Sequence, residues 1–89
     1  MLAMLLNYVM KNTDINNIVE LENFIQSSGH EYQAIGKEIK IYLLDDSEIH
    51  IIVDNTIEIY TYHIKNADHK YSLKNIIEAK DLLNRFITS

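Results

Sequence analysis

Histidines are the residues of this 89-residue chain most suited to metal binding or proton transfer. They are His30, His50, His63 and His69, and no two of them have the H-x-x-x-H or H-E-x-x-H spacing of a helical metal motif. Asp68 and His69 together with His63 form the one conceivable cluster, although a loop separates the two histidines. We therefore expect surface histidines and no metal site.

Serines and aspartates offer no better support for catalysis. Ser27-Ser28, Ser47 and Ser72 fall at expected helix ends or turns, where hydrogen bonds to the local backbone account for them. The Asp45-Asp46 pair is typical of a turn. The absence of cysteine excludes thiol chemistry, and two glycines with no proline exclude a glycine-rich phosphate loop or a flexible linker. The sequence thus predicts a non-catalytic protein that needs no cofactor.

Composition indicates one globular domain over residues 1–89, with 47% hydrophobic and 24% charged residues. No stretch approaches the roughly 20 apolar residues that span a bilayer. The apolar start of the chain is interrupted at Asn7 and has no basic residue before it, so we expect a cytoplasmic protein without a signal peptide. Abundant isoleucine, asparagine, lysine and tyrosine indicate an AT-rich genome, such as that of a low-GC bacterium, its phage or a plasmid.

Three segments have helical periodicity. Apolar residues repeat at helical spacing over residues 2–11 and again over 14–28, where Thr13 or Asp14 would cap the helix start and Gly29 would close its end. A last helix begins after Ser72 as N-cap and has pairs spaced for ion pairing at Lys74–Glu78 and Asp81–Arg85.

The middle of the chain alternates with period two and is rich in β-branched and aromatic residues. Strands are expected over residues 38–43, 48–51 and 57–62, and a weaker fourth strand at Glu31–Ile35 would turn at Gly36-Lys37. The sequence predicts a two-layer α+β fold in which helices pack on one face of a 3–4-stranded antiparallel meander, in the order α-α-β-β-β-α.

One face of this meander takes every odd-numbered apolar residue. They are Ile39, Ile41, Leu43, Ile49, Ile51, Val53, Ile57 and Ile59. Odd parity on both strands of a pair requires loops of odd length, and we expect the three-residue loops Asp45-Asp46-Ser47 and Asp54-Asn55-Thr56. In the second loop, Asn55 would be left-handed. The expected pairs are Leu43–Ile49, Ile41–Ile51, Val53–Ile57 and Ile51–Ile59. His63 shares this parity, so the alternative to a surface position for this histidine is a cap on the edge of the core.

The even-numbered positions form the opposite face, called here the outer face. They are Glu38, Lys40, Tyr42, Leu44, Glu48, His50, Ile52, Asp54, Glu58, Tyr60, Tyr62 and Ile64. The expected register places His50 opposite Tyr42 and Tyr60. Tyrosine is a residue that protein interfaces favour, so this face is a candidate interaction surface. Two alternatives stay open, because helix 2–11 could cover the face or it could be an ordinary solvated sheet.

Charge is uneven along the chain, at −2 for residues 1–30, −5 for residues 31–64 and +2 for residues 65–89. An acidic sheet favours a protein partner with a basic patch, and a net charge of −5 argues against direct nucleic-acid binding. Double-stranded-RNA-binding domains share the order helix, three strands, helix, but they begin the last helix with basic residues. Here Lys74 is followed by Glu78, so the chemistry of that family is missing.

These observations favour a small acidic interaction protein. Tyr42, His50, Tyr60 and Tyr62 would anchor a protein partner, while acidic residues would steer it, namely Glu48, Asp54 and Glu58. Size and composition are analogous to those of inhibitors from mobile genomes, such as phage anti-defence proteins, anti-CRISPR proteins among them, or immunity proteins. The alternatives are a homo-oligomer that associates through the same face and a weak nucleic-acid binder that uses the basic residues of the C-terminal region.

Overall fold

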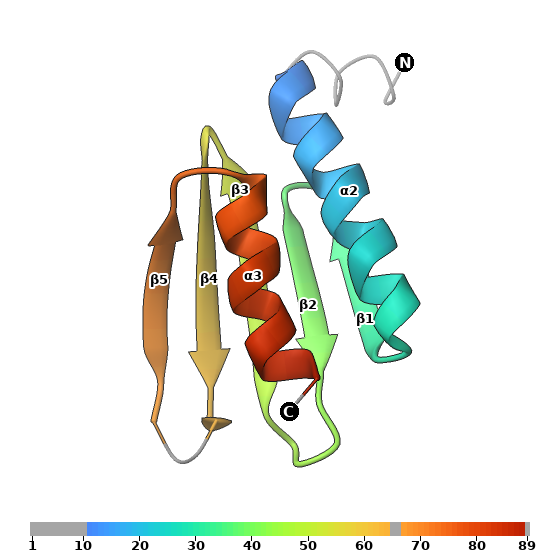
Figure 1. Cartoon of the computed structure of the whole chain (residues 1–89), viewed down its shortest axis with the longest axis vertical. Coiled ribbons are helices and arrows are strands. Elements are labelled where there is room, and N and C mark those ends of the chain that lie inside the picture. The colour runs from blue at the N-terminus through green and yellow to red at the C-terminus, as the bar shows by residue number, and fades with distance from the viewer. Residues whose placement is uncertain (1–10, 65–66, 89) are drawn as a thin grey trace.

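Over residues 11–64 and 67–88, the protein folds as a five-stranded antiparallel sheet with two helices on one face (Figure 1). The computed structural model describes residues 11–64 and 67–88. The elements follow in the order α2 (Asn12–Ser28), β1 (Glu31–Ile35), β2 (Glu38–Tyr42), β3 (Glu48–Asp54), β4 (Thr56–Tyr62), β5 (His69–Leu73) and α3 (Ile76–Ile87). Strand order in the sheet equals chain order. The predicted two-layer α+β class is confirmed. The sheet has five strands where three or four were expected. The helix expected over 2–11 lies outside the described residues.

The core lies between the sheet and the helices and consists of the odd-numbered residues of the three central strands. Each of these side chains is at most 3% exposed: Ile39, Ile41, Ile49, Ile51, Val53, Ile57 and Ile59. The helices contribute residues at helical spacing, namely Ile18, Leu21, Ile25, Ala79, Leu83 and Ile87. The predicted inward face is therefore confirmed, and burial of these apolar side chains is the main source of stability.

Strand β1 is the predicted fourth strand, and the turn at Gly36-Lys37 is confirmed. A loop of two residues reverses parity, so even-numbered Tyr32 and Ala34 stand opposite Ile41 and Ile39 on the helix side. Gly36 has a φ of 58°, a left-handed conformation that glycine adopts without steric cost.

Strand β5 was not predicted, because Tyr71 and Leu73 are its only apolar residues. Their side chains pack against the core, and Tyr71 pairs with Ile59 of β4. Ser72 is consequently a strand residue, and its expected role as N-cap is wrong. Asn75 caps α3, since its side-chain oxygen accepts a hydrogen bond from the Glu78 N–H at 2.9 Å. The expected Lys74–Glu78 pairing occurs instead through the backbone, where the Lys74 N–H donates to the Glu78 carboxylate at 3.0 Å.

The β2–β3 register differs from the expected one by two residues. Ile41 pairs with Ile49 and Ile39 with Ile51, and the loop is Leu44–Asp46. Asp46 takes the left-handed position with a φ of 67°, and the Asp45 carboxylate accepts a hydrogen bond from the Ser47 N–H at 3.0 Å. That bond holds the pKa of Asp45 below its ordinary value. A shift of two residues preserves parity, so the faces stay as predicted although the loop does not.

The β3–β4 hairpin has the predicted pairs Val53–Ile57 and Ile51–Ile59, and Asn55 is left-handed with a φ of 64°. It is tied to α2 by Asp14, which is 4% exposed. Both carboxylate oxygens of Asp14 accept the Asn55 N–H, at 3.2 and 3.1 Å. Neither Thr13 nor Asp14 caps α2, because the helix begins at Asn12, two residues earlier than expected, and Lys11 is its N-cap residue. The predicted closure of α2 by left-handed Gly29 is confirmed at a φ of 82°.

Candidate functional site

The outer face of the sheet carries no helix among residues 11–64 and 67–88, since α2 and α3 both lie on the other face (Figure 1). Cross-strand pairing arranges its side chains in rows. One row reads Glu31, Tyr42, Glu48 and Tyr62, the next Gln33, Lys40, His50, Tyr60 and Lys70, and the third Ile35, Glu38, Ile52, Glu58 and Ser72. Six of the seven predicted site residues therefore share this face, all of them partly exposed.

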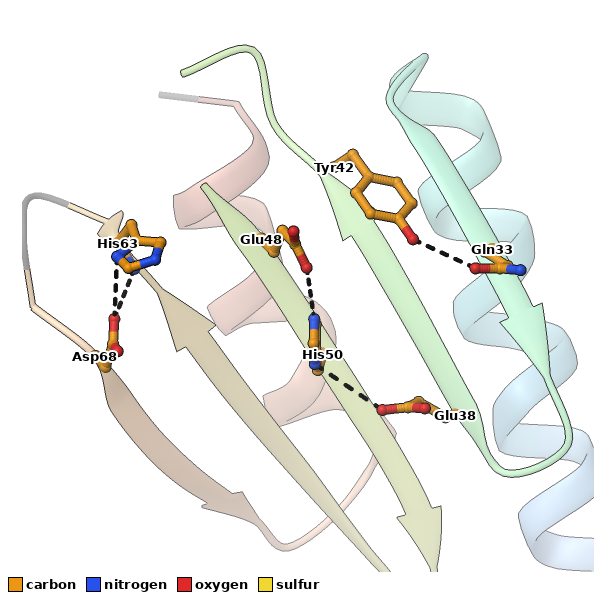
Figure 2. Close-up of polar contacts among 7 residues, drawn as sticks. All are labelled: Gln33, Glu38, Tyr42, Glu48, His50, His63 and Asp68. Carbon is orange, nitrogen blue, oxygen red and sulfur yellow. Dashed lines mark hydrogen bonds and ion pairs between the residues drawn. The ribbon is translucent and has the colours of Figure 1, made fainter. Parts of the chain in front are cut away.

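His50 lies at the centre of the face, in the middle row (Figure 2). Its Nε2 is 2.8 Å from a carboxylate oxygen of Glu48, and its Nδ1 is 4.0 Å from one of Glu38. The imidazole also contacts the ring of Tyr62, with centroids 4.6 Å apart at 55°. Its predicted position opposite Tyr60 is confirmed. The predicted position opposite Tyr42 is wrong, because the β2–β3 register shift places Lys40 there instead.

Tyr42 stands in the neighbouring row, opposite Glu48. Its hydroxyl donates to the side-chain oxygen of Gln33 in β1 at 3.3 Å (Figure 2). Tyr62 stands on the other side of Glu48 in the same row. One carboxylate is thus flanked by two tyrosines, an arrangement that combines aromatic area with negative charge.

Tyr60 belongs to a second charged group, which includes a residue that sequence analysis missed. The Tyr60 hydroxyl donates to Glu58 at 3.1 Å, and Lys70 of β5 lies 3.3 Å from the other oxygen of Glu58. The Lys70 ammonium is also 5.8 Å from the centre of the Tyr60 ring. Hydrogen bonding and attraction by Glu58 raise the pKa of Lys70 above its ordinary value. Lys70 could not be placed beside Glu58 without knowledge of β5.

Three residues assigned to the outer face lie elsewhere. Asp54 is at the end of β3, exposed and paired with Lys37 at 3.1 Å, so it borders the face. Leu44 is in the β2–β3 loop and is 98% exposed. Ile64 packs against the core, because the left-handed backbone at His63, with a φ of 67°, turns the chain away from the sheet.

His63 is a surface histidine as predicted, and the alternative that it caps the core is wrong, since its side chain is 77% exposed. Its N–H donates to the Asp68 carboxylate at 2.7 Å, and its Nδ1 is 4.0 Å from the same oxygen (Figure 2). Within the described part of the chain, no three histidine or carboxylate side chains are arranged to hold a metal ion.

A pocket of about 600 Å³ lies at the end of the two layers where α3 finishes. Its lining is largely apolar and comes from segments far apart in the sequence: Leu43, Leu44, Ile64, Phe86 and Ile87, with His30, Asp45 and Arg85. The His30 ring is bound to the Ile87 carbonyl at 2.8 Å, which fixes one wall. No motif in the sequence could have indicated it, because four separate segments converge only in the fold.

No protein-family model, curated protein or solved structure matches this chain. None of the described helices is both long enough and apolar enough to cross a membrane. The outer face is therefore the feature of this chain that bears on its function.

Proposed function

We propose that this chain is a non-catalytic module that binds a protein partner through the outer face of its sheet. Tyr42, His50, Tyr60 and Tyr62 are the anchors. The observation that carries the proposal is the gathering of three partly exposed tyrosines around His50 on a sheet face that no described helix covers. Tyrosine offers a large contact area at low cost in side-chain entropy, and its hydroxyl supplies a hydrogen bond.

The chemistry of the face favours a partner with a basic patch. Four carboxylates stand in the three rows, against two lysines, and one of those lysines is paired with Glu58. Glu48 lies between two tyrosines, and Glu38 faces His50 across the strands. An arginine or lysine of the partner would meet aromatic rings and carboxylates together, while Glu48, Glu58 and the bordering Asp54 would accelerate its approach.

An inhibitor is the class of binding protein that we favour. Small size, net negative charge and an AT-rich composition support an anti-defence protein of a phage, an anti-CRISPR protein among these, or an immunity protein. Such a protein acts by occupying a functional surface of its target, and a sheet face that no described helix covers suits that purpose.

A comparison of partner capture tests the proposal. The wild-type chain and a Tyr42→Ala/Tyr60→Ala variant serve as baits in lysate of a low-GC bacterium, and the recovered protein is then purified and titrated by calorimetry. The control bait carries Ile77→Ala, a substitution at a residue of α3 that is 68% exposed on the helix side. We expect the control to bind like wild type and the tyrosine variant to bind at least about tenfold more weakly.

Equal binding by all three baits contradicts the proposal. If no partner is recovered and Tyr60→Glu converts a dimer to monomer, the outer face is a self-interface, which is the alternative that the sequence left open.

A further inference from the structure

The outer edge of β1 has backbone groups that no described strand pairs. Two backbone hydrogen bonds show which residues of β2 face β3: the Leu43 N–H donates to the Ser47 carbonyl and the Val53 N–H donates to the Lys37 carbonyl, each at 2.9 Å. Odd-numbered residues along β2 therefore face β3, and even-numbered ones face β1. Those even residues pair with odd residues of β1, so the backbone N–H and C=O groups of Tyr32 and Ala34 point away from the sheet.

Within the part of the chain that the structure describes, the β1 sequence lacks the residues by which proteins usually prevent strand addition, although α2 packs beside this edge on the helix side (Figure 1). Lysine, proline, bulges and inward-pointing charges serve that purpose at sheet edges. The β1 sequence, EYQAI, has only Glu31 as a charge, at its very start, and its pairing with β2 is regular over five residues. The opposite edge strand, β5, carries His69 and Lys70.

Apolar side chains flank the edge on both sides of the sheet. Ile35 is 65% exposed on the outer face, in the same row as Glu38. Val19 is 52% exposed on α2, three residues from Glu22 and so on the same flank of the helix. Glu22 marks that flank as the one toward β1, because its carboxylate accepts the Tyr32 hydroxyl at 2.9 Å. A strand added at this edge would cover apolar surface as well as pair backbone groups.

The β1 sequence is complementary to itself when two copies run antiparallel with Gln33 at the centre. Tyr32 of one copy then stands opposite Ala34 of the second copy, a large side chain against a small one. Glu31 stands opposite Ile35 of the second copy, so no like charges meet. Tyr32 and Ala34 are the residues whose outward backbone groups no described strand pairs, and their two symmetric pairings would form four hydrogen bonds.

We infer that β1 is the surface at which a second copy of this chain binds, giving an antiparallel β1–β1 pair and one sheet continuous across both copies. This interface is distinct from the outer face, which a dimer of this kind leaves open to a partner. It is closed by a two-fold axis, so assembly stops at the dimer.

Sedimentation of the full chain over a range of concentrations tests the inference. We expect a reversible dimer whose dissociation constant rises at least about tenfold on Ile35→Glu, because glutamate then faces Glu31 of the second copy twice. Ile77→Glu is the matched control, since Ile77 is 68% exposed on α3, and it should leave dimerisation unchanged.

The register itself is tested by rescue. Glu31→Lys combined with Ile35→Glu places lysine opposite glutamate at both ends of the pair, and dimerisation should return to within about threefold of wild type. Because Glu38 of the same chain also faces position 35, thermal melting of each variant checks that it is folded. Ala34→Pro is a second disrupting variant, which removes a free-edge N–H that the β1–β2 pairing does not use.

Three outcomes would overturn the inference. These are a chain that stays monomeric at millimolar concentration, a dimer that tolerates both Ile35→Glu and Ala34→Pro, and a failure of the charge exchange to restore association. A dimer that is instead broken by Tyr60→Glu alone would assign self-association to the outer face.

Discussion

Asp14 and Asn55, 41 residues apart in the chain, are joined by a partly buried hydrogen bond from the Asn55 N–H to the Asp14 carboxylate. The bond links the first turn of α2 to the left-handed turn between β3 and β4. It connects the two layers of the protein at one end.

Asp14→Ala should therefore lower the free energy of unfolding by about 1.5–3 kcal/mol, because a backbone N–H loses its charged acceptor. Denaturant unfolding of the purified chain measures the change. Asp81→Ala, at an exposed position of α3, is the control and should stay within about 0.5 kcal/mol of wild type. A loss of that small size for Asp14→Ala would contradict a stabilising role for the bond.

Tyr60 and Tyr71 lie on opposite faces of the sheet and should respond differently to truncation. Tyr60→Ala should weaken partner binding by about 1–3 kcal/mol and leave the melting temperature nearly unchanged. Tyr71 packs against the core and near the Phe86 ring, with centroids 5.9 Å apart, so Tyr71→Ala should lower the melting temperature. Calorimetric titration and thermal melting of both variants measure these effects. A lower melting temperature for Tyr60→Ala, with no change for Tyr71→Ala, would show that the two faces are wrongly assigned.

Lys70 offsets part of the negative charge of the outer face through its ion pair with Glu58. Lys70→Gln should increase the rate of association with a basic partner severalfold at low salt, and the gain should shrink as salt is added. Stopped-flow measurements at two ionic strengths test this. Lys74→Gln, which makes the same charge change at an exposed position after β5, is the control. A slower rate for Lys70→Gln would indicate an acidic partner.

The carboxylate of Asp45 in the β2–β3 loop should make the stability of the protein depend on pH in the acid range. The Ser47 N–H stabilises the charged carboxylate, so the pKa of Asp45 is lower in the folded protein than in the unfolded chain. The resulting stability is present at pH values above the unfolded pKa of about 3.9 and is lost as pH falls through the lower folded pKa. The free energy of unfolding, measured from pH 6 to pH 2, should decrease less steeply with falling pH for Asp45→Asn than for wild type. Identical slopes would show that this bond adds no pH dependence.

Parity is the part of the fold that the sequence predicted well. Any odd loop length between two strands keeps the same residues inward, so an error of two residues in the β2–β3 register did not disturb the assignment of Ile41 or Tyr42 to a face. The exact loop depended on which residue takes the left-handed position, and Asp46 was not distinguishable from its neighbours by residue type.

Long-range contacts were beyond the sequence pattern. Asp14 has the chemistry of a helix cap, and only the arrangement of α2 over the sheet reveals that it binds Asn55 instead. Strand β5 has too few β-branched residues to stand out, so neither Tyr71 in the core nor Lys70 beside Glu58 could be predicted. The outer tyrosines were predictable because they need only parity.

Residues of the core and residues of the outer face occupy alternate positions along β2, β3 and β4. Substitutions at even positions such as His50 or Tyr60 leave the isoleucine layer untouched, and substitutions within that layer leave the exposed chemistry in place. A lineage of such chains can therefore diversify its exposed residues rapidly while inheriting one unchanged interior. If the target of such a protein changes during evolution, the exposed residues of each strand can change with it while the buried residues of the same strand keep the fold.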